Sequence, residues 1–272
     1  MLKSFDCVII GIQANEIGNQ IREKALKYSI PVVLLDHFDH PEVYLDPSFK
    51  NIFRGLESKK DFNLYFKHDL PKGKYIDQLL YPLAPMPCNP KNYPKLNSVW
   101  TKKNISIFYR GRTSHNPRED RVLMSEEIKK RIEFSNIQNI DQTEKITIFD
   151  YAKNLSKTKI ALTPSGKVWD STRHTEIGLY NCVPLIPEPD CETVNDFIKD
   201  NENAIVYNVN KLNNRSKNSR INIESIMEKI EYLLADDDKL KEMAKKWRDE
   251  VLLNHTIYAR SNMVLDKIRS LK

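Results

Sequence analysis

One segment in the second half of the chain combines polar, basic and acidic residues at spacings that suit a charged ligand. Residues 159–162 form an apolar run that predicts a strand, and a small polar turn, Thr163-Pro-Ser-Gly166, follows it. A second apolar run, 183–186, predicts the next strand. A strand–turn–helix–strand unit puts the turn and the helix N-terminus at the carboxyl edge of a parallel sheet, where open α/β sheets bind their ligands.

The helix expected between these two strands carries the side chains that would meet such a ligand. Ser171 or Thr172 can cap its N-terminus, and Arg173 and Glu176 stand three residues apart, so both lie on one face. Because helix N-termini attract phosphate, the pattern predicts a diphosphate site with Glu176 one turn deeper, where it can accept from sugar hydroxyls. The residues expected at the diphosphate are Ser165, Gly166, Lys167, Ser171, Thr172 and Arg173. An ordinary ion pair between Arg173 and Glu176 on a solvated helix is the alternative.

The same segment resembles the nucleotide-sugar-binding core of GT-B glycosyltransferases, especially the exostosin-like and CgeB-like groups. Those groups have a strand ending in a Pro-Ser/Arg-Gly-type turn, then Ser-x-Arg-x-x-(Glu/Asp), then a Cys-Ile/Val-Pro strand. Arg173, Glu176 and Pro184 fall at matching offsets. Asn254-His-Thr-Ile-Tyr-Ala-Arg260 is similar to the helix that ends CgeB-like domains, and Phe108-Tyr-Arg-Gly-Arg112 to their first strand and glycine turn.

This resemblance, which covers roughly residues 100 to 272, implies an α/β fold of the GT-B type. Such a fold has two Rossmann-like domains with parallel sheets facing a cleft, and a C-terminal helix that crosses back to the first domain. The expected parts are an acceptor domain at 1–97, a nucleotide-sugar-binding domain at 98–256 and the returning helix at 257–272. One or both of Arg110 and Arg112, at the glycine turn, are expected to reach the diphosphate.

The resemblance also implies that the acceptor binds the first domain, so the acid–base residue is expected there. Inverting transfer needs a carboxylate or histidine to take the acceptor's hydroxyl proton. The end of the second predicted strand offers Asp36, Asp39 and His40, and Lys67 and His68 lie at the end of the next strand as the other cleft candidates. Ordinary loop polarity is the alternative explanation for this cluster.

Position 168, eight residues before Glu176, is Val and not the Glu of retaining Glu-x7-Glu enzymes, so inversion is expected. The predicted function is a glycosyltransferase that moves a sugar from a nucleoside diphosphate donor to a glycan, lipid-linked glycan or protein. Arginine, hydroxyls and a helix N-terminus would stabilise the leaving group, with no cofactor and no essential metal. A non-catalytic nucleotide- or glycan-binding module on the same frame is the alternative.

Composition agrees with this prediction. With 40% apolar residues among 272, the chain can bury two compact cores, and no run approaches the roughly 20 apolar residues of a membrane span. The net charge of +6 is modest and its lysines are dispersed, which favours anionic sugar nucleotides or a peripheral membrane contact over nucleic acid. The four scattered cysteines form no disulfide or metal pattern, and no signal-peptide pattern is visible, so a cytoplasmic location is expected.

Strands and helices alternate along the chain, as in parallel α/β sheets. Predicted strands lie at 6–12, 31–35, 63–67, 78–83, 105–109, 159–162, 183–186 and 204–207. Predicted helices lie at 14–28, 118–134, 148–155, 193–199, 221–234, 237–251 and 257–271. Four prolines between Pro85 and Pro94 predict an irregular linker that crosses between the domains. Asn181 stands where the similar groups usually have Gly, and Asn tolerates the left-handed backbone of such a turn.

Overall fold

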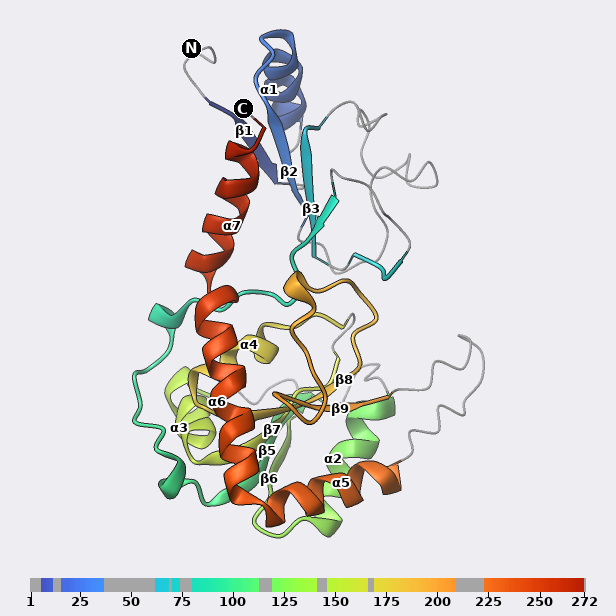
Figure 1. Cartoon of the computed structure of the whole chain (residues 1–272), viewed down its shortest axis with the longest axis vertical. Coiled ribbons are helices and arrows are strands. Elements are labelled where there is room, and N and C mark those ends of the chain that lie inside the picture. The colour runs from blue at the N-terminus through green and yellow to red at the C-terminus, as the bar shows by residue number, and fades with distance from the viewer. Residues whose placement is uncertain are drawn as a thin grey trace. The chain divides into compact units, whose positions relative to one another are not determined.

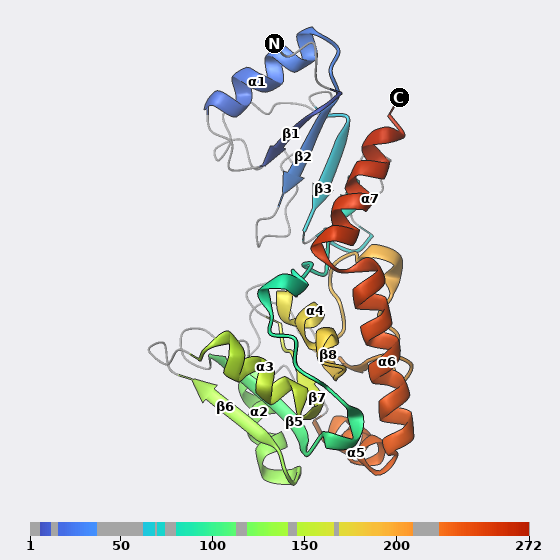
Figure 2. The ribbon, with the colours of Figure 1, turned by 90° about the vertical axis from the view of Figure 1, so that its left-hand side faces the viewer.

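The chain divides into two compact units, each an α/β unit (Figures 1 and 2). The computed structural model describes residues 6–11, 16–36, 62–68, 70–73, 80–112, 119–140, 146–165, 169–208 and 223–271. Unit 1 consists of residues 1–85, 190–196 and 260–272, and unit 2 of residues 86–189 and 197–259. The expected boundary was residue 97, whereas residues 86–97 group with unit 2.

Unit 1 contains a four-stranded parallel sheet in the order β1-β2-β3-β4. Its strands are β1 (Val8–Gly11), β2 (Val32–Asp36), β3 (Leu64–Lys67) and β4 (Leu80–Pro82). The two faces of this sheet are covered by helices from opposite ends of the sequence, α1 (Glu16–Lys27) and α7 (Ile257–Arg269) (Figure 2).

The alternation of side chains along the strands explains this double cover. Leu34 points to the α1 side, where it packs with Ala25. Val33 and Phe66 point to the opposite side, where they pack with Ile268 of α7. The C-terminal helix therefore returns to the first sheet, as the resemblance implied.

Unit 2 contains a five-stranded parallel sheet in the order β6-β5-β7-β8-β9. Its strands are β5 (Ile105–Arg112), β6 (Asn136–Ile140), β7 (Thr158–Leu162), β8 (Val183–Pro187) and β9 (Ile205–Tyr207). Its helices are α2 (Glu119–Arg131), α3 (Ile148–Ser156), α4 (Thr172–Leu179), α5 (Ile223–Ala235) and α6 (Asp237–Asn254). The first strand, β5, has β6 on one side and β7 on the other, so the strand order reverses between β5 and β7.

Three local features differ from the sequence-based predictions or refine them. β6 was not predicted, and the helix predicted at 193–199 is only a 3₁₀ turn, Val194–Asp196, because Asn195 has a φ of 64°. The proline-rich segment is irregular as expected, but it contains the 3₁₀ turn Pro90–Asn92, and from Met86 on it groups with unit 2. The left-handed backbone expected at Asn181 is confirmed, with a φ of 55°.

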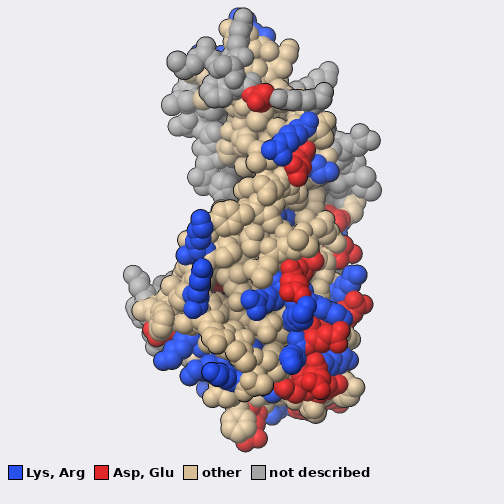
Figure 3. Space-filling view, turned by 60° about the vertical axis from the view of Figure 1, so that its left-hand side comes forward, with Lys and Arg blue, Asp and Glu red and all other residues tan. Residues whose placement is uncertain are grey.

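Charged side chains of both signs are interspersed on the face shown in Figure 3. On α6, for example, Lys245 pairs with Asp249 at 2.5 Å and Lys246 with Glu242 at 2.7 Å. Exposed pairs of this kind add little stability.

Candidate functional site

The turn after β7 and the N-terminus of α4 lie at the carboxyl edge of the unit 2 sheet, next to the end of β5. β5 and β7 are parallel neighbours, so residues 110–112, which end β5 and pair with β6, and residues 163–165, which follow β7, lie at the same edge of the sheet. This is the point where the strand order reverses, and open α/β sheets bind ligands there. Thr163 and Ser165 are buried, while Gly166 and Lys167 lie outside the described residues.

Arg110 is half-buried near the end of β5. The backbone of Arg112 belongs to the same strand, but its side chain lies outside the described part. Between them, Gly111 leaves room for a neighbour, because a Cβ there would meet the hydroxyl of Tyr109 at 2.2 Å. Gly111 lies within β5, paired with Asn139, and not in the glycine turn that the resemblance implied, because the strand predicted to end at residue 109 continues to Arg112.

The N-terminus of α4 is capped by Ser171, whose Oγ accepts a hydrogen bond from the backbone N–H of Arg173 at 3.3 Å. This confirms Ser171, and not Thr172, as the cap. The first turn of α4 carries no acidic residue, so the partial positive charge of the helix N-terminus is not offset by one within that turn. Asp170, just before the cap, accepts from the backbone N–H of Met86 at 2.6 Å.

His174 fixes the two ends of the turn relative to α4. Its Nδ1 lies 2.7 Å from Thr163 Oγ1, and its Nε2 lies 2.8 Å from the carbonyl oxygen of Trp169. A carbonyl oxygen only accepts, so Nε2 carries the proton and Nδ1 accepts from the threonine hydroxyl. Burial lowers the pKa of His174 to about 4, which keeps the ring neutral near pH 7.

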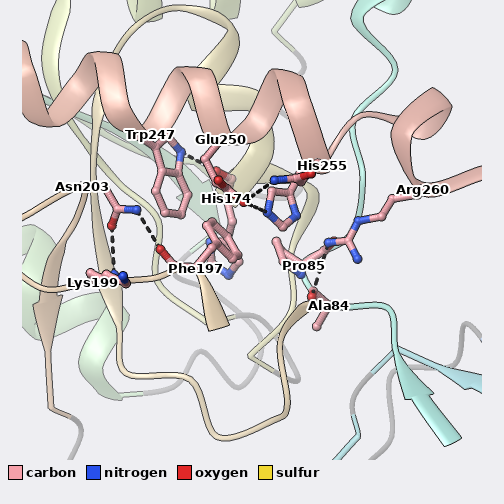
Figure 4. A network of polar contacts seen from close by, with 11 residues as sticks. Ala84, Pro85, His174, Phe197, Lys199, Asn203, Trp247, Glu250, His255 and Arg260 are labelled. Carbon is pink, nitrogen blue, oxygen red and sulfur yellow. Dashed lines mark hydrogen bonds and ion pairs between the residues drawn. The ribbon is translucent and has the colours of Figure 1, made fainter. Parts of the chain in front are cut away.

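The same helix turn is tied to α6 and to the segment after residue 196 (Figure 4). The indole N–H of Trp247 donates to the carbonyl oxygen of His174 at 3.1 Å. Phe197 lies between two aromatic rings, with ring centroids 5.0 Å from Trp247 and 4.0 Å from His255. The turn and α4 are therefore held by buried contacts and not by the turn's own sequence alone.

Helix α4 also approaches α6 closely at Gly178. A Cβ at that position would lie 2.8 Å from Cγ2 of Val251 and 2.9 Å from its Cβ. Contacts this short require the neighbour to move, so only Gly allows the two helices to pack as they do. The close approach at Gly178 sets the position of α4 against α6.

Arg173 and Glu176 do not form the ordinary ion pair that was the alternative interpretation. Both side chains are half-exposed, and within the described residues Arg173 makes no side-chain hydrogen bond or ion pair. Glu176 instead accepts a short hydrogen bond through Oε1 from the hydroxyl of Tyr93. One cation and one carboxylate oxygen on the same face of α4 thus face no partner in the described part of the chain.

Tyr93 belongs to the proline-rich segment, and hydrogen bonds hold this segment along α4. The carbonyl oxygen of Met86 accepts from Thr175 Oγ1 at 2.9 Å, and that of Pro94 accepts from the Tyr180 hydroxyl at 3.0 Å. Ser98 donates to the carbonyl oxygen of Tyr180 at the C-terminus of the helix.

Four weakly acidic side chains, on which the charge of Glu176 acts, have a raised pKa. Burial raises the pKa of Cys88 to about 11 and of Tyr180 to about 12, with a smaller contribution from the charge of Glu176. Burial and the same charge raise the pKa of Tyr93 and of Tyr151 still further. Arg173 opposes the shift at Tyr151, so that hydroxyl senses both charged residues of α4. All four groups stay protonated near pH 7.

The catalytic candidates lie in unit 1, where only some can be placed. Asp36 is fully buried, accepts from the Tyr65 hydroxyl at 2.6 Å and lies 3.3 Å from Lys67 Nζ. The register pairs Asp36 with Lys67 on adjacent strands, which places the two side chains together. His68 is buried directly after Lys67, and Asp39 and His40 lie outside the described residues.

The sequence did not point to Tyr93, Tyr151 or His174. Tyr93 sits in a stretch whose prolines predicted only irregular chain, and its partner is 83 positions away. His174, between Arg173 and Glu176, could have been noticed as a buried position on the face opposite to them, since it is two residues from Glu176.

Two properties concern the described residues as a whole. No group of three or more His, Cys, Asp and Glu side chains among them is arranged to hold a metal ion. In the same residues, no helix has both the length and the apolar character needed to cross a membrane.

The two parallel sheets, of four and five strands, match those of GT-B glycosyltransferase structures, which confirms the α/β fold predicted from the sequence. No protein-family model matches the chain, and no curated protein matches it either. The chain can be superposed on TarM with a TM-score of 0.52 and 14% identity, over 96% of this chain and 54% of TarM.

This chain covers a larger share of two further solved structures. One is an alpha-glucosyltransferase in complex with UDP and a 13-mer DNA containing a HMU base, with a TM-score of 0.51 and 16% identity, over 98% of this chain and 80% of that chain. The other is a glycosyltransferase from Rickettsia africae, with a TM-score of 0.54, 10% identity, and 95% and 82% covered. At these identities the similarity establishes the fold, while the chain spans only about half of TarM.

Proposed function

We propose that this protein is a GT-B glycosyltransferase, similar to the exostosin-like and CgeB-like groups, that transfers a sugar from a nucleoside diphosphate donor to a glycan, lipid-linked glycan or protein. The donor is bound by unit 2, with its diphosphate at the N-terminus of α4. We further propose that the transfer inverts the configuration at the anomeric carbon of the sugar and needs no essential metal. We place the protein in the cytoplasm, where it can associate peripherally with a membrane.

One observation carries the proposal: Arg173 and Glu176 stand on the same face of α4, at the reversal of strand order, without pairing with each other. A half-exposed arginine with no described partner is suited to a charged hydrogen bond with phosphate. The capped helix end and the hydroxyls of Ser171 and Thr172 add donors at the same place. Glu176 is left to accept from hydroxyls of the donor. Two structural neighbours are glycosyltransferases by name, and one was solved with UDP.

The decisive experiment is nucleotide binding by calorimetry and thermal shift, starting with UDP, GDP, ADP and CMP and their sugars. Arg173→Ala is expected to weaken nucleotide binding by about 1.5–3 kcal/mol, because it removes a charged hydrogen bond to the diphosphate. Glu176→Gln is expected to impair binding of the sugar nucleotide with the fold intact.

A matched control is Arg131→Ala. Arg131 lies at the C-terminal end of α2 and pairs with Glu224 at 2.9 Å and Glu231 at 3.0 Å. Removing it changes the net charge of unit 2 by the same amount as Arg173→Ala, away from the carboxyl edge of the sheet. If both arginine variants bind equally well, or both lose the same affinity, the assignment of the diphosphate site is wrong.

For the chemical step, we propose that the loop beginning at Asp36 supplies the base that deprotonates the acceptor, with Asp36, Asp39 and His40 as candidates. The burial of Asp36 beside Lys67 also favours a second candidate function, a non-catalytic binding module, because a fully buried, ion-paired carboxylate is poorly placed to reach an acceptor hydroxyl. Release of UDP or another nucleotide from a bound sugar nucleotide in the presence of acceptor glycans separates the two functions.

A further inference from the structure

Although lysines occur throughout the chain, its excess of positive charge is concentrated in one stretch. Residues 78–118 contain seven Lys and Arg residues and no Asp or Glu, which is more than the whole net charge of +6. The remainder of the chain is therefore close to neutral. Four of the seven basic residues lie in the segment 86–104, which consists of the proline-rich stretch and its continuation to β5.

This basic segment lies against the C-terminal end of α3. The hydroxyl of Ser98 lies 3.4 Å from the carbonyl oxygen of Ser156, the last residue of the helix. The backbone N–H groups of Asn104 and Ile105 donate to the carbonyl oxygen of Lys157 at 3.0 and 2.9 Å. The positive charge of the segment is thus joined to whatever charge α3 presents.

One side of α3 carries an aromatic and two basic side chains in a row. Phe149, Lys153 and the C-cap Lys157 follow one another at intervals of four residues, which places them on the same side of the helix. All three are exposed, Phe149 by 52%. Because α3 connects the parallel strands β6 and β7, its N-terminal end, with Phe149, lies at the carboxyl edge of the sheet. The one acidic residue of α3, Asp150, accepts at 2.6 Å from the hydroxyl of the N-cap Thr147.

Five exposed lysines of the segment and of α3, here called the lysine surface, carry charge that no neighbour cancels. Among the described residues none of the five forms an ion pair, whereas the exposed lysines of α6 pair with Asp249 and Glu242. On the face in Figure 3, red side chains lie mainly toward the right, among the blue ones of α6, and the blue side chains farther left stand apart from them. The lysine surface consists of Lys91, Lys95, Lys102, Lys153 and Lys157.

The exposed side chains beside these lysines are apolar or aromatic. Ile148 and Phe149 are about half exposed at the start of α3, and Tyr258 is exposed with Lys91 Nζ 5.2 Å from the centre of its ring. Large apolar side chains next to lysines are typical of surfaces that lie at a membrane interface, where the lysines are attracted by anionic lipids. The lysine surface contains no arginine, the residue whose planar fork most often reads base edges in nucleic acids.

We propose that the lysine surface, together with Ile148 and Phe149, docks unit 2 on an anionic lipid bilayer. The lysines contact the phosphate headgroups, and the two apolar side chains enter the boundary of the acyl layer. Docking in this way holds the carboxyl edge of the unit 2 sheet close to the bilayer. The inference gives the peripheral membrane contact a surface and a lipid charge, and its consequence for a lipid-linked acceptor rests on the proposed function.

The test is cosedimentation of the full chain with phosphatidylcholine vesicles that contain or lack phosphatidylglycerol. Binding is expected only when phosphatidylglycerol is present, and it should weaken as salt is raised. The double variant Lys153→Ala/Lys157→Ala should bind about 10- to 30-fold more weakly, because two charges near the anionic surface are lost. Phe149→Ala should bind about tenfold more weakly with the salt dependence unchanged, because it loses an apolar contact.

Two control variants match these changes. Lys245→Ala/Lys246→Ala removes the same charge from α6, where both lysines are exposed but ion-paired. Phe134→Ala removes an exposed phenylalanine at the opposite edge of the sheet, because residue 134 precedes β6. Both controls are expected to bind the vesicles like the full chain. Tryptophan fluorescence checks that each variant is folded, since all three tryptophans, at positions 100, 169 and 247, lie in unit 2.

Equal losses in the two lysine double variants would show that net charge alone acts, which would overturn the inference. So would a lack of binding to vesicles with phosphatidylglycerol, or tighter binding to a DNA duplex that Phe149→Ala leaves unchanged. Calorimetry of nucleotide binding on the same proteins separates the inference from the proposed function. Nucleotide binding without vesicle binding refutes the docking surface alone, and vesicle binding without nucleotide binding refutes the donor site alone.

Discussion

Acid should weaken unit 2 through His174, the residue that joins the turn after β7 to α4. In the folded protein the pKa of His174 is lowered by burial from 6.5 to about 4. Between these pH values the unfolded chain takes up a proton that the folded chain does not bind. The stability that the neutral His174 contributes is therefore complete above pH 6.5. It is lost progressively as the pH falls from 6.5 toward 4.

The size of the effect follows from the shift. Each pKa unit corresponds to about 1.36 kcal/mol, so the difference between 6.5 and about 4 corresponds to a loss of about 3 kcal/mol. Solvent does not screen this effect, because the His174 ring is fully buried. Carboxylates such as Asp237, whose pKa is lowered by its hydrogen bond with Lys159, add to the acid sensitivity.

A non-titrating variant separates His174 from the carboxylates. In His174→Gln the unfolding free energy should fall by about 3 kcal/mol less between pH 7 and pH 4 than in the parent protein. Urea unfolding followed by tryptophan fluorescence measures this for unit 2 alone, since all three tryptophans lie there. An identical pH dependence in the two proteins would refute the conclusion that His174 is neutral and hydrogen-bonded to Thr163 and Trp169 in the folded protein.

The remaining predictions concern packing, the buried ion pair and catalysis. Gly178→Ala should destabilise unit 2 by about 1–3 kcal/mol in urea unfolding, because the added Cβ would lie 2.8 Å from Val251 Cγ2. Adding Val251→Ala should relieve part of that cost. If the losses of the two single variants simply add in the double variant, the contact does not limit the packing. Asp36→Asn should cost unit 1 about 3–5 kcal/mol by breaking its buried ion pair with Lys67. If Asp36 is also the base, that variant should lower turnover by about 10²–10⁴ even at a temperature where it stays folded; a loss no larger than the unfolded fraction would mark Asp36 as structural. Transfer activity should survive EDTA, and restoration of lost activity by Mg²⁺ or Mn²⁺ would show that a metal is needed.

The strand–turn–helix–strand unit from β7 to β8 could be predicted because its apolar runs are short, separate and bounded by turn residues. β6 could not, since only Ile137 and Ile140 are apolar in its five residues and it pairs with β5 alone. The helix predicted at 193–199 failed at Asn195, whose left-handed backbone interrupts an otherwise helical pattern. That conformation depends on where the chain must turn, which local spacing does not reveal.

The candidate site shows the same division. Arg173, Glu176 and the Ser171 cap follow from spacing along one helix, which is a local property. Tyr93 could not be assigned, because prolines indicate irregular backbone but do not indicate whether that backbone is fastened to anything. Its contact with Glu176 arises from tertiary packing across the sequence, and only the structure brings the two together.

The discontinuous make-up of unit 1 has a consequence for biosynthesis. Its second sheet face is covered by Ile268 and its neighbours on α7, which leave the ribosome after the whole of unit 2. Unit 2 is one continuous stretch, residues 86–259, apart from residues 190–196, which belong to unit 1. It can therefore fold while Val33 and Phe66, on strands that are synthesised first, are still exposed. The part synthesised first is therefore completed last, and its nascent sheet is the stage at which chaperones would be needed most.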